Sequence, residues 1–115
     1  MVSELQSAQA SASTVLLTPI VSVYEASTAT QLKRKATELL TKSTHNVILN
    51  LSKVNHMDSF GLASILSILK ACKELGGTLV LLNPNSTVLQ LIQLTRLTTI
   101  LSVVETQEEA LALLQ

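Results

Sequence analysis

The hydrophobic pattern of this chain changes from strand-like to helix-like near its middle. Residues 47–51 form a run that is apolar at every position but one, which is typical of a strand covered on both faces. The polar segment 52–56 follows, and from Ser59 onward the apolar positions recur at helical spacing. The pattern therefore predicts a buried strand at 47–51 and a helix at about 59–75, with Asp58 and Ser59 at the turn between them.

The same pattern predicts the other elements. A helix at 28–43 carries Lys33, Arg34, Lys35 and Glu38 on its solvated face, and Gly76-Gly77 ends the helix at 59–75. Beyond those glycines we expect a strand at 78–82, a helix at 86–95, a strand at 100–104 and a helix at 107–114. The expected N-terminal caps of these helices are Ser27 or Thr28, Asn85 or Ser86, and a capping box from Thr106 to Glu109.

The N-terminal part is less regular. Residues 1–13 are rich in Ser, Ala and Gln without clear periodicity, so we expect a flexible tail there and one folded domain over 14–115. Residues 14–24 are β-branched and apolar but contain Pro19, which predicts a bent edge strand or two short strands. Because strand and helix alternate from residue 47 onward with short links, the fold class is α/β with a largely parallel sheet.

Composition and charge exclude several classes of protein. In 115 residues, 47% hydrophobic and 14% charged positions exclude a disordered chain and fit one domain. The formal net charge is zero, so no basic field attracts nucleic acid or an anionic membrane. The apolar runs are too short to cross a bilayer, and no signal peptide is evident, so we expect a cytoplasmic protein.

Candidate catalytic groups are scarce. Ser59 lacks the glycine-flanked context of a nucleophile elbow, and His45 and His56 have no ligand spacing. Cys72 falls on the apolar stripe of its helix, as a buried thiol would. We therefore expect no enzyme activity, no cofactor and no metal site. On the residues alone, Ser59 or Asp58 is either simply a helix cap or, in the case of Ser59, a position for modification at the positive end of a helix.

Four segments together resemble the STAS family, the sulphate-transporter and anti-sigma-factor-antagonist domains, in its stand-alone bacterial antagonist form. The resemblance covers residues 15–114 and implies a mixed sheet of four to five strands with about four helices. It rests on VILNL at 47–51, MDSFGL at 57–62, KACK at 70–73 and GGTLV at 76–80.

The resemblance also implies a function. In that family a partner kinase phosphorylates the serine that directly follows this aspartate, which here is Ser59. The implied partners are an anti-sigma factor that is also a serine kinase, bound while Ser59 is unphosphorylated, and a serine phosphatase that resets the switch. No direct contact with nucleic acid or membrane is implied. The implied partner-binding residues are Glu25, Asp58, Ser59, Phe60, Gly61 and Leu62.

The chain departs from the family pattern at three positions. Phe60 stands where antagonists usually have Ser or Thr, and it is either an exposed binding anchor or a core residue. Glu25 replaces an aspartate before the first helix, and Arg96 replaces a frequent glycine. Arg96 therefore either occupies a strained turn or marks a different one. Phe60 also leaves open a stressosome-like scaffold that forms homo-oligomers, and an accessory STAS subunit of a transport system is a further alternative.

Overall fold

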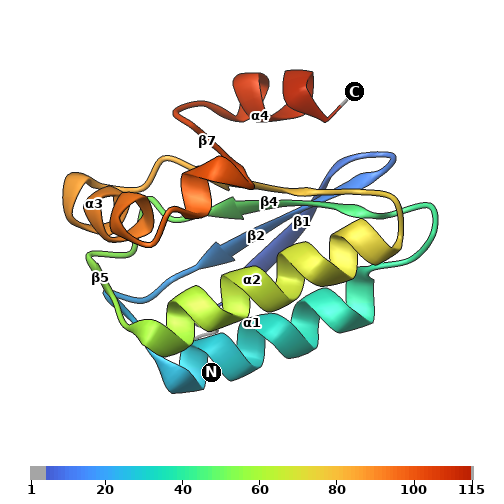
Figure 1. The fold of residues 1–115 in the computed structure, drawn as a ribbon. Coiled ribbons are helices and arrows are strands. Elements are labelled where there is room, and N and C mark those ends of the chain that lie inside the picture. Colours follow the sequence, from blue (N-terminus) through green and yellow to red (C-terminus); the bar gives the residue numbers. More distant parts are fainter. Residues whose placement is uncertain (1–4, 115) are drawn as a thin grey trace.

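A computed structural model of the chain describes residues 5–114 (Figure 1). Strands and helices alternate along most of these residues. The strands are β1 (Leu5–Ser11), β2 (Thr14–Pro19), β3 (Val23–Tyr24), β4 (Asn46–Asn50), β5 (His56–Met57), β6 (Leu79–Leu82) and β7 (Ser102–Val104). The helices are α1 (Ala26–Leu39), α2 (Ser59–Glu74), α3 (Ser86–Leu94) and α4 (Gln107–Leu113), and a short 3-10 helix, η1 (Leu97–Thr99), follows α3.

The main sheet is mixed, with strand order β1-β2-β4-β6-β7. Only β1 runs antiparallel to its neighbour, and the pairs β2–β4, β4–β6 and β6–β7 are parallel. The two-residue strands β3 and β5 form a separate parallel pair. The predicted α/β class, with a mixed sheet of four to five strands and about four helices, is confirmed.

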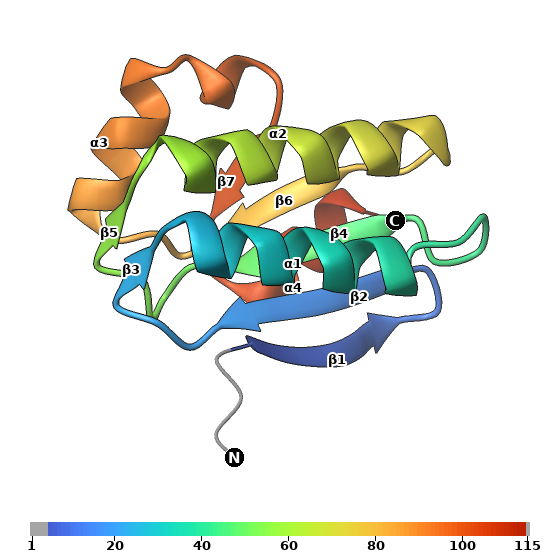
Figure 2. The ribbon, with the colours of Figure 1, turned by 90° about the horizontal axis from the view of Figure 1, so that it is seen from below.

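Helices cover the two faces of the sheet unequally. Helices α1 and α2 lie side by side across one face, whereas α4 lies over part of the other (Figures 1 and 2). The larger core fills the space under α1, α2 and α3, and a smaller one lies under α4 around Ile48 and Val80. Both cores are almost entirely aliphatic, and each fully buried Leu or Ile contributes about 1.5–3 kcal/mol. Along residues 5–114, no helix has both the length and the apolar character that spanning a membrane requires.

The N-terminal segment differs from the expected flexible tail over 1–13. Residues Leu5–Ser11 form β1, which pairs with β2 from Leu5↔Pro19 to Ser11↔Thr14. The segment shows no apolar alternation because most of its side chains are exposed, so backbone pairing holds it in place. Residues 1–4 of the expected tail lie outside the described residues. Because β1 flanks it, β2 is not an edge strand, and of the two alternatives for 14–24 the structure has two short strands.

Most of the predicted helix ends are confirmed. Asn85 caps α3 through Val88 N–H at 2.8 Å, and Thr106 Oγ1 caps α4 through Glu109 N–H at 3.2 Å. Gly76 ends α2 in the left-handed region at φ 88°. The caps expected from Ser27 or Thr28 are wrong, because α1 begins earlier, after Glu25, and has no side-chain cap.

Arg96 settles one of the alternatives left by the sequence. It has φ 62° and ψ 20° between α3 and η1, the left-handed conformation that costs a residue with a Cβ about 1–2 kcal/mol. The turn is therefore strained rather than rebuilt, and it has the backbone conformation that glycine adopts most easily.

Candidate functional site

The small sheet of β3 and β5 brings two helix starts together. Its parallel register pairs Tyr24 with Met57, so the next residues, Glu25 and Asp58, emerge at the same edge. The backbone N–H of Asp58 also donates to the carbonyl of Tyr24 at 3.2 Å. Glu25 is the N-cap residue of α1 and Asp58 that of α2, so two carboxylates lie at one rim of the molecule, where the two helices start near each other in Figure 1.

Ser59 is the first residue of α2 and is exposed at this rim. The cap belongs to Asp58, whose Oδ1 accepts from the N–H groups of Phe60 at 2.9 Å and Gly61 at 3.1 Å. The expectation that the Ser59 hydroxyl caps the helix is therefore wrong, and of the two candidate caps Asp58 is the correct one. Within residues 5–114 nothing hydrogen-bonds the Ser59 Oγ, so this oxygen points to solvent without an internal role.

Gly61, two residues after Ser59, is buried. A Cβ at this position would lie 2.6 Å from Met57 Cγ, 2.8 Å from Tyr24 Cδ1 and 3.0 Å from the Tyr24 carbonyl oxygen. The absence of a side chain thus lets the first turn of α2 rest directly on β3 and β5. Gly61 therefore helps to fix the position of Ser59, and its role in partner binding stays a prediction.

A buried hydrogen-bond chain reinforces this contact. Ser64 Oγ donates to the carbonyl of Gly61 at 2.8 Å, and the fully buried Tyr24 hydroxyl donates in turn to Ser64 Oγ. Burial raises the pKa of Tyr24 well above its usual range, which keeps the hydroxyl protonated as a donor. Tyr24 and Ser64 were not predicted as site residues. Tyr24 is the single tyrosine of the sequence, but its pairing with Ser64, forty residues away, has no local signal.

Apolar side chains border the rim. Phe60 is 60% exposed, which decides between the two alternatives for this residue: it is a surface side chain and not part of the core. Leu62 is half-buried and packs against the larger core, so it presents only part of its surface. Val23 in β3 is 43% exposed and pairs with His56, and the sequence did not single it out. An exposed aromatic beside Ser59 is the type of group that anchors a partner protein.

The charge of the rim is acidic and uncompensated. Within residues 5–114 the only ion pair is Lys35–Glu38 on α1, so neither Glu25 nor Asp58 is neutralised by a basic partner. In the same part of the chain, no three His, Cys, Asp or Glu side chains gather as a metal site would require. Cys72 is buried as predicted, and burial raises the pKa of its thiol to about 11.

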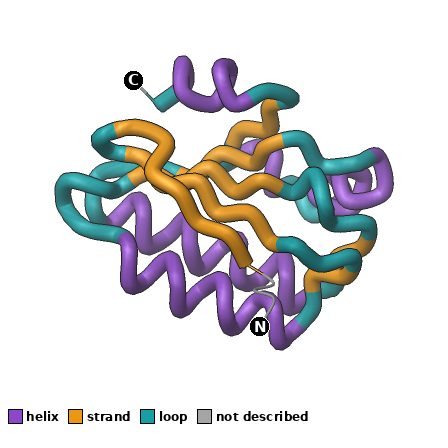
Figure 3. The backbone as a smooth tube through the Cα atoms, turned by 180° about the vertical axis from the view of Figure 1, so that it is seen from behind, coloured by secondary structure: helices purple, strands orange, loops and turns teal. Residues whose placement is uncertain are grey.

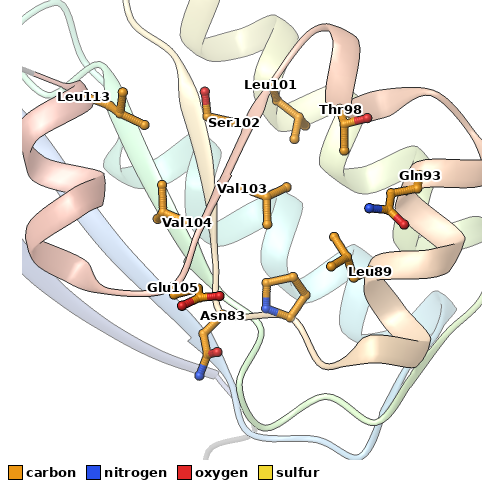
Figure 4. Close-up of a pocket in the computed structure, with 11 residues that line it drawn as sticks. Asn83, Leu89, Gln93, Thr98, Leu101, Ser102, Val103, Val104, Glu105 and Leu113 are labelled. Carbon is orange, nitrogen blue, oxygen red and sulfur yellow. The ribbon is translucent and has the colours of Figure 1, made fainter.

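A cavity lies elsewhere in the molecule. It has a volume of about 600 Å³ and runs along β7 between α3, η1 and α4, with Val103 on its floor (Figure 4). Its polar groups include Gln93, Ser102 and Glu105, none of which belongs to the rim. Ser59 is exposed and is not among the residues that line this cavity.

A comparison with protein families finds a match over most of the chain. The model of the STAS domain matches residues 8–110. The chain belongs to the STAS domain family. Two STAS relatives, from Thermotoga neapolitana and Thermotoga maritima, are described as candidate anti-sigma factor antagonists. Each is 38% identical over 74 residues, which is 64% of this chain and 66% of the relative's length.

Solved STAS structures share the fold. The crystal structure of the candidate antagonist TM1081 from Thermotoga maritima has a TM-score of 0.80 and 29% identity, covering 96% of this chain and 92% of that one. The anti-sigma factor antagonist SpoIIAA in its unphosphorylated form has a TM-score of 0.79 and 24% identity, covering 93% and 92%. At that identity the likeness to SpoIIAA shows the fold alone.

Proposed function

We propose that this protein is an anti-sigma factor antagonist that works as a partner-switching protein in the cytoplasm, with Ser59 as its phosphorylation site. The observation that carries the proposal is the exposed Ser59 hydroxyl at the start of α2, free of hydrogen bonds to the described residues. The description of the Thermotoga relatives as candidate antagonists supports it. In this proposal the unphosphorylated rim binds an anti-sigma factor that is also a serine kinase, and a serine phosphatase restores it.

The physical switch is a change of charge on a surface that must lose water. A phosphoryl group adds about −1.5 to −2 charges at neutral pH. It would stand beside Asp58 and Glu25, where no basic side chain is paired with either carboxylate. A partner that covers Phe60 would then have to desolvate a strongly anionic rim, which opposes binding.

The fold itself should tolerate the modification. The N-terminal end of a helix favours negative charge, and Asp58 already caps the Phe60 and Gly61 N–H groups. A phosphate on Ser59 therefore adds to the cap without displacing it. The proposed role is regulatory, since Ser59 is the substrate of another protein's chemistry and no catalytic group is assigned to this chain.

Phosphorylation can be tested by intact-mass spectrometry. The protein is incubated with ATP and, one at a time, the serine-kinase anti-sigma factors of its own organism. We expect the mass of one phosphoryl group to be added to the wild type and to Ser86→Ala, an exposed helix-start serine elsewhere, but not to Ser59→Ala. Modification of Ser59→Ala to the same extent would assign the phosphate to another residue.

Binding can be tested with two variants that are matched in shape and differ in charge. Ser59→Asp places a negative charge at the rim, whereas Ser59→Asn has nearly the same shape without the charge. In pull-downs with the same anti-sigma factors, we expect Ser59→Asn to retain binding and Ser59→Asp to lose at least tenfold in affinity, about 1.4 kcal/mol. Equal binding by the two variants would contradict the charge switch.

A further inference from the structure

The two edges of the main sheet differ in length and charge. The edge strand β7 has three residues and is followed by Glu105, with Glu108 and Glu109 in the first turn of α4. The opposite edge strand, β1, has seven residues (LQSAQAS), with neither a charge nor a proline among them. Charged side chains, proline and short length are the usual means of preventing one edge strand from pairing with another. The edge at β7 has two of these protections, and β1 has none of the three.

Among residues 5–114, side chains and neighbouring elements also leave the central part of β1 uncovered. Its central residues, Gln6 to Gln9, are exposed on both faces of the strand. In the ladder with β2, Ser7 pairs with Leu17 and Ala8 with Leu16, so one side of β1 is paired and the other faces outward. Figure 2 shows β1 at the margin of the molecule. Figure 3 shows the face of the sheet that α1 and α2 do not cover, and α4 lies on this face near β6 and β7, away from β1.

The open segment of β1 has a defined end. A bulge interrupts the ladder between Gln9 and Ser11, and the Gln9 Nε2 donates to the Ser11 carbonyl at 2.6 Å. The bulge breaks the regular spacing of donors and acceptors beyond Gln9, and this side-chain bond already uses one of the two lone pairs of the Ser11 carbonyl. Regular pairing along the outer side of β1 is therefore expected only for Gln6 to Ala8, which precede the bulge.

We propose that β1 pairs with β1 of a second copy of this chain, in antiparallel orientation about a two-fold axis at Ser7. Ser7 then faces the partner's Ser7, and Gln6 faces the partner's Ala8. An antiparallel pair of identical strands is self-complementary, because each strand offers the same donors and acceptors to the other. A second copy brings no like charge to an uncharged strand, and the small Ser7 and Ala8 side chains leave room for close approach.

The pairing makes one sheet continuous through both copies and leaves the rim free. Ser59 lies at the start of α2, and α1 lies between α2 and β1 (Figure 2). Each dimer would present two separate copies of the rim, whatever that rim binds. Because the paired segment is short beside the ~1,200–2,000 Å² buried in standard stable interfaces, the association is weak and increases with concentration.

Sedimentation velocity over rising concentration tests the dimer. We expect a concentration-dependent shift from the 12.3 kDa monomer toward twice that mass by about 1 mM protein. Ser7→Lys places two like charges at the axis and should abolish the shift, whereas Ser43→Lys, in an exposed loop, should leave it unchanged. A protein that stays monomeric throughout, or a dimer that Ser7→Lys leaves intact, would overturn the proposal.

Disulfide trapping tests the register. Directly opposed residues in an antiparallel pair have Cα atoms about 4.5–5.5 Å apart, within the range of a disulfide. Ser7→Cys should therefore form a covalent dimer under mild oxidation. Gln9→Cys should not, because Gln9 of one copy lies several residues along the strand from Gln9 of the other copy. The buried Cys72 gives the wild type no accessible thiol as a background. Equal cross-linking of Ser7→Cys and Gln9→Cys would indicate random collision and refute the register.

Discussion

Helices α1 and α2 begin at neighbouring positions but are held in different ways. Both follow a two-residue strand, and the register of β3 and β5 places Glu25 and Asp58 in equivalent positions. Asp58 caps α2 through two backbone N–H groups, whereas Glu25 makes no side-chain cap. Aspartate has the length to reach the N–H groups of the first turn and is a preferred N-cap, which glutamate is not.

Packing widens this difference between the two helix starts. The first turn of α2 also rests on β3 through Gly61 and is tied to Tyr24 through Ser64. A residue that must present its hydroxyl in one place to another protein benefits from such support. The pairing of β3 with β5 brings the two helix starts close together, and the residues that follow these strands decide which helix start is firmly held.

The largest expected effect comes from filling the space at Gly61. Gly61→Ala should lower the free energy of unfolding by about 1–3 kcal/mol, because the added methyl group meets Tyr24 and Met57 at less than contact distance. This loss must exceed the ~1 kcal/mol that alanine normally gains over glycine in a helix. Urea unfolding measures it, with Ala63→Val on the exposed side of the same turn as the control. A more stable Gly61→Ala would show that the helix start can move away from β3.

Removing the buried hydroxyl contact should come next. Ser64→Ala leaves the Tyr24 hydroxyl buried without its acceptor and should cost about 2 kcal/mol. Tyr24→Phe should cost about 1 kcal/mol, and the double variant should cost less than the sum of the two. Chemical denaturation of the four proteins gives the coupling energy. Strictly additive losses would mean that the two hydroxyls do not support each other.

The same contact should make stability sensitive to alkaline pH. Burial raises the folded-state pKa of Tyr24, while the unfolded chain loses this proton near pH 10. Stability is therefore fully present below pH 10 and falls as pH rises above it, by up to about 1.4 kcal/mol per unit. Comparing the wild type with Tyr24→Phe between pH 9 and 11 isolates this residue. The stability advantage of the wild type should shrink over that range, and a constant difference would contradict the assignment.

The smallest effects should appear at the caps themselves. Asp58→Ala should cost about 1 kcal/mol, whereas Glu25→Ala should change stability by less than 0.5 kcal/mol, because only Asp58 caps its helix. Glu25→Ser should stabilise α1 by a few tenths of a kcal/mol by supplying the missing cap. Thermal unfolding checks all three, with Asp58→Asn as the variant that retains a good cap. Similar losses of stability from Asp58→Ala and Glu25→Ala would contradict the conclusion that only the start of α2 is capped.

The sequence predicted the regular part of this fold well. From β4 onward, long aliphatic runs and clear glycine or asparagine signals placed the strands and helices within a few residues of their observed ends. The strand β1 was missed because its side chains stay exposed and carry no alternation, and β3 and β5 are too short for any period to show. The pairing of β3 with β5 joins segments distant in the chain, which a local pattern does not detect, whereas β1 is held by a hairpin with the adjacent β2.

The candidate site was only partly predictable for the same reason. The position of Ser59 at a helix start follows from the change of hydrophobic period, but the choice between Asp58 and Ser59 as the cap needed the backbone geometry. The burial of Gly61 arises from Tyr24, which precedes it by more than thirty residues. The role of Ser59 as a phosphorylation site stays a prediction.

The burial of Cys72 has a practical consequence for studying this molecule in solution. A thiol with a raised pKa inside the core reacts slowly with alkylating dyes. A cysteine placed at an exposed position such as Phe60 would therefore take up a fluorophore selectively, without the native thiol being removed first. Changes in the fluorescence intensity of that dye would then report the binding and dissociation of a partner protein at the acidic rim in real time.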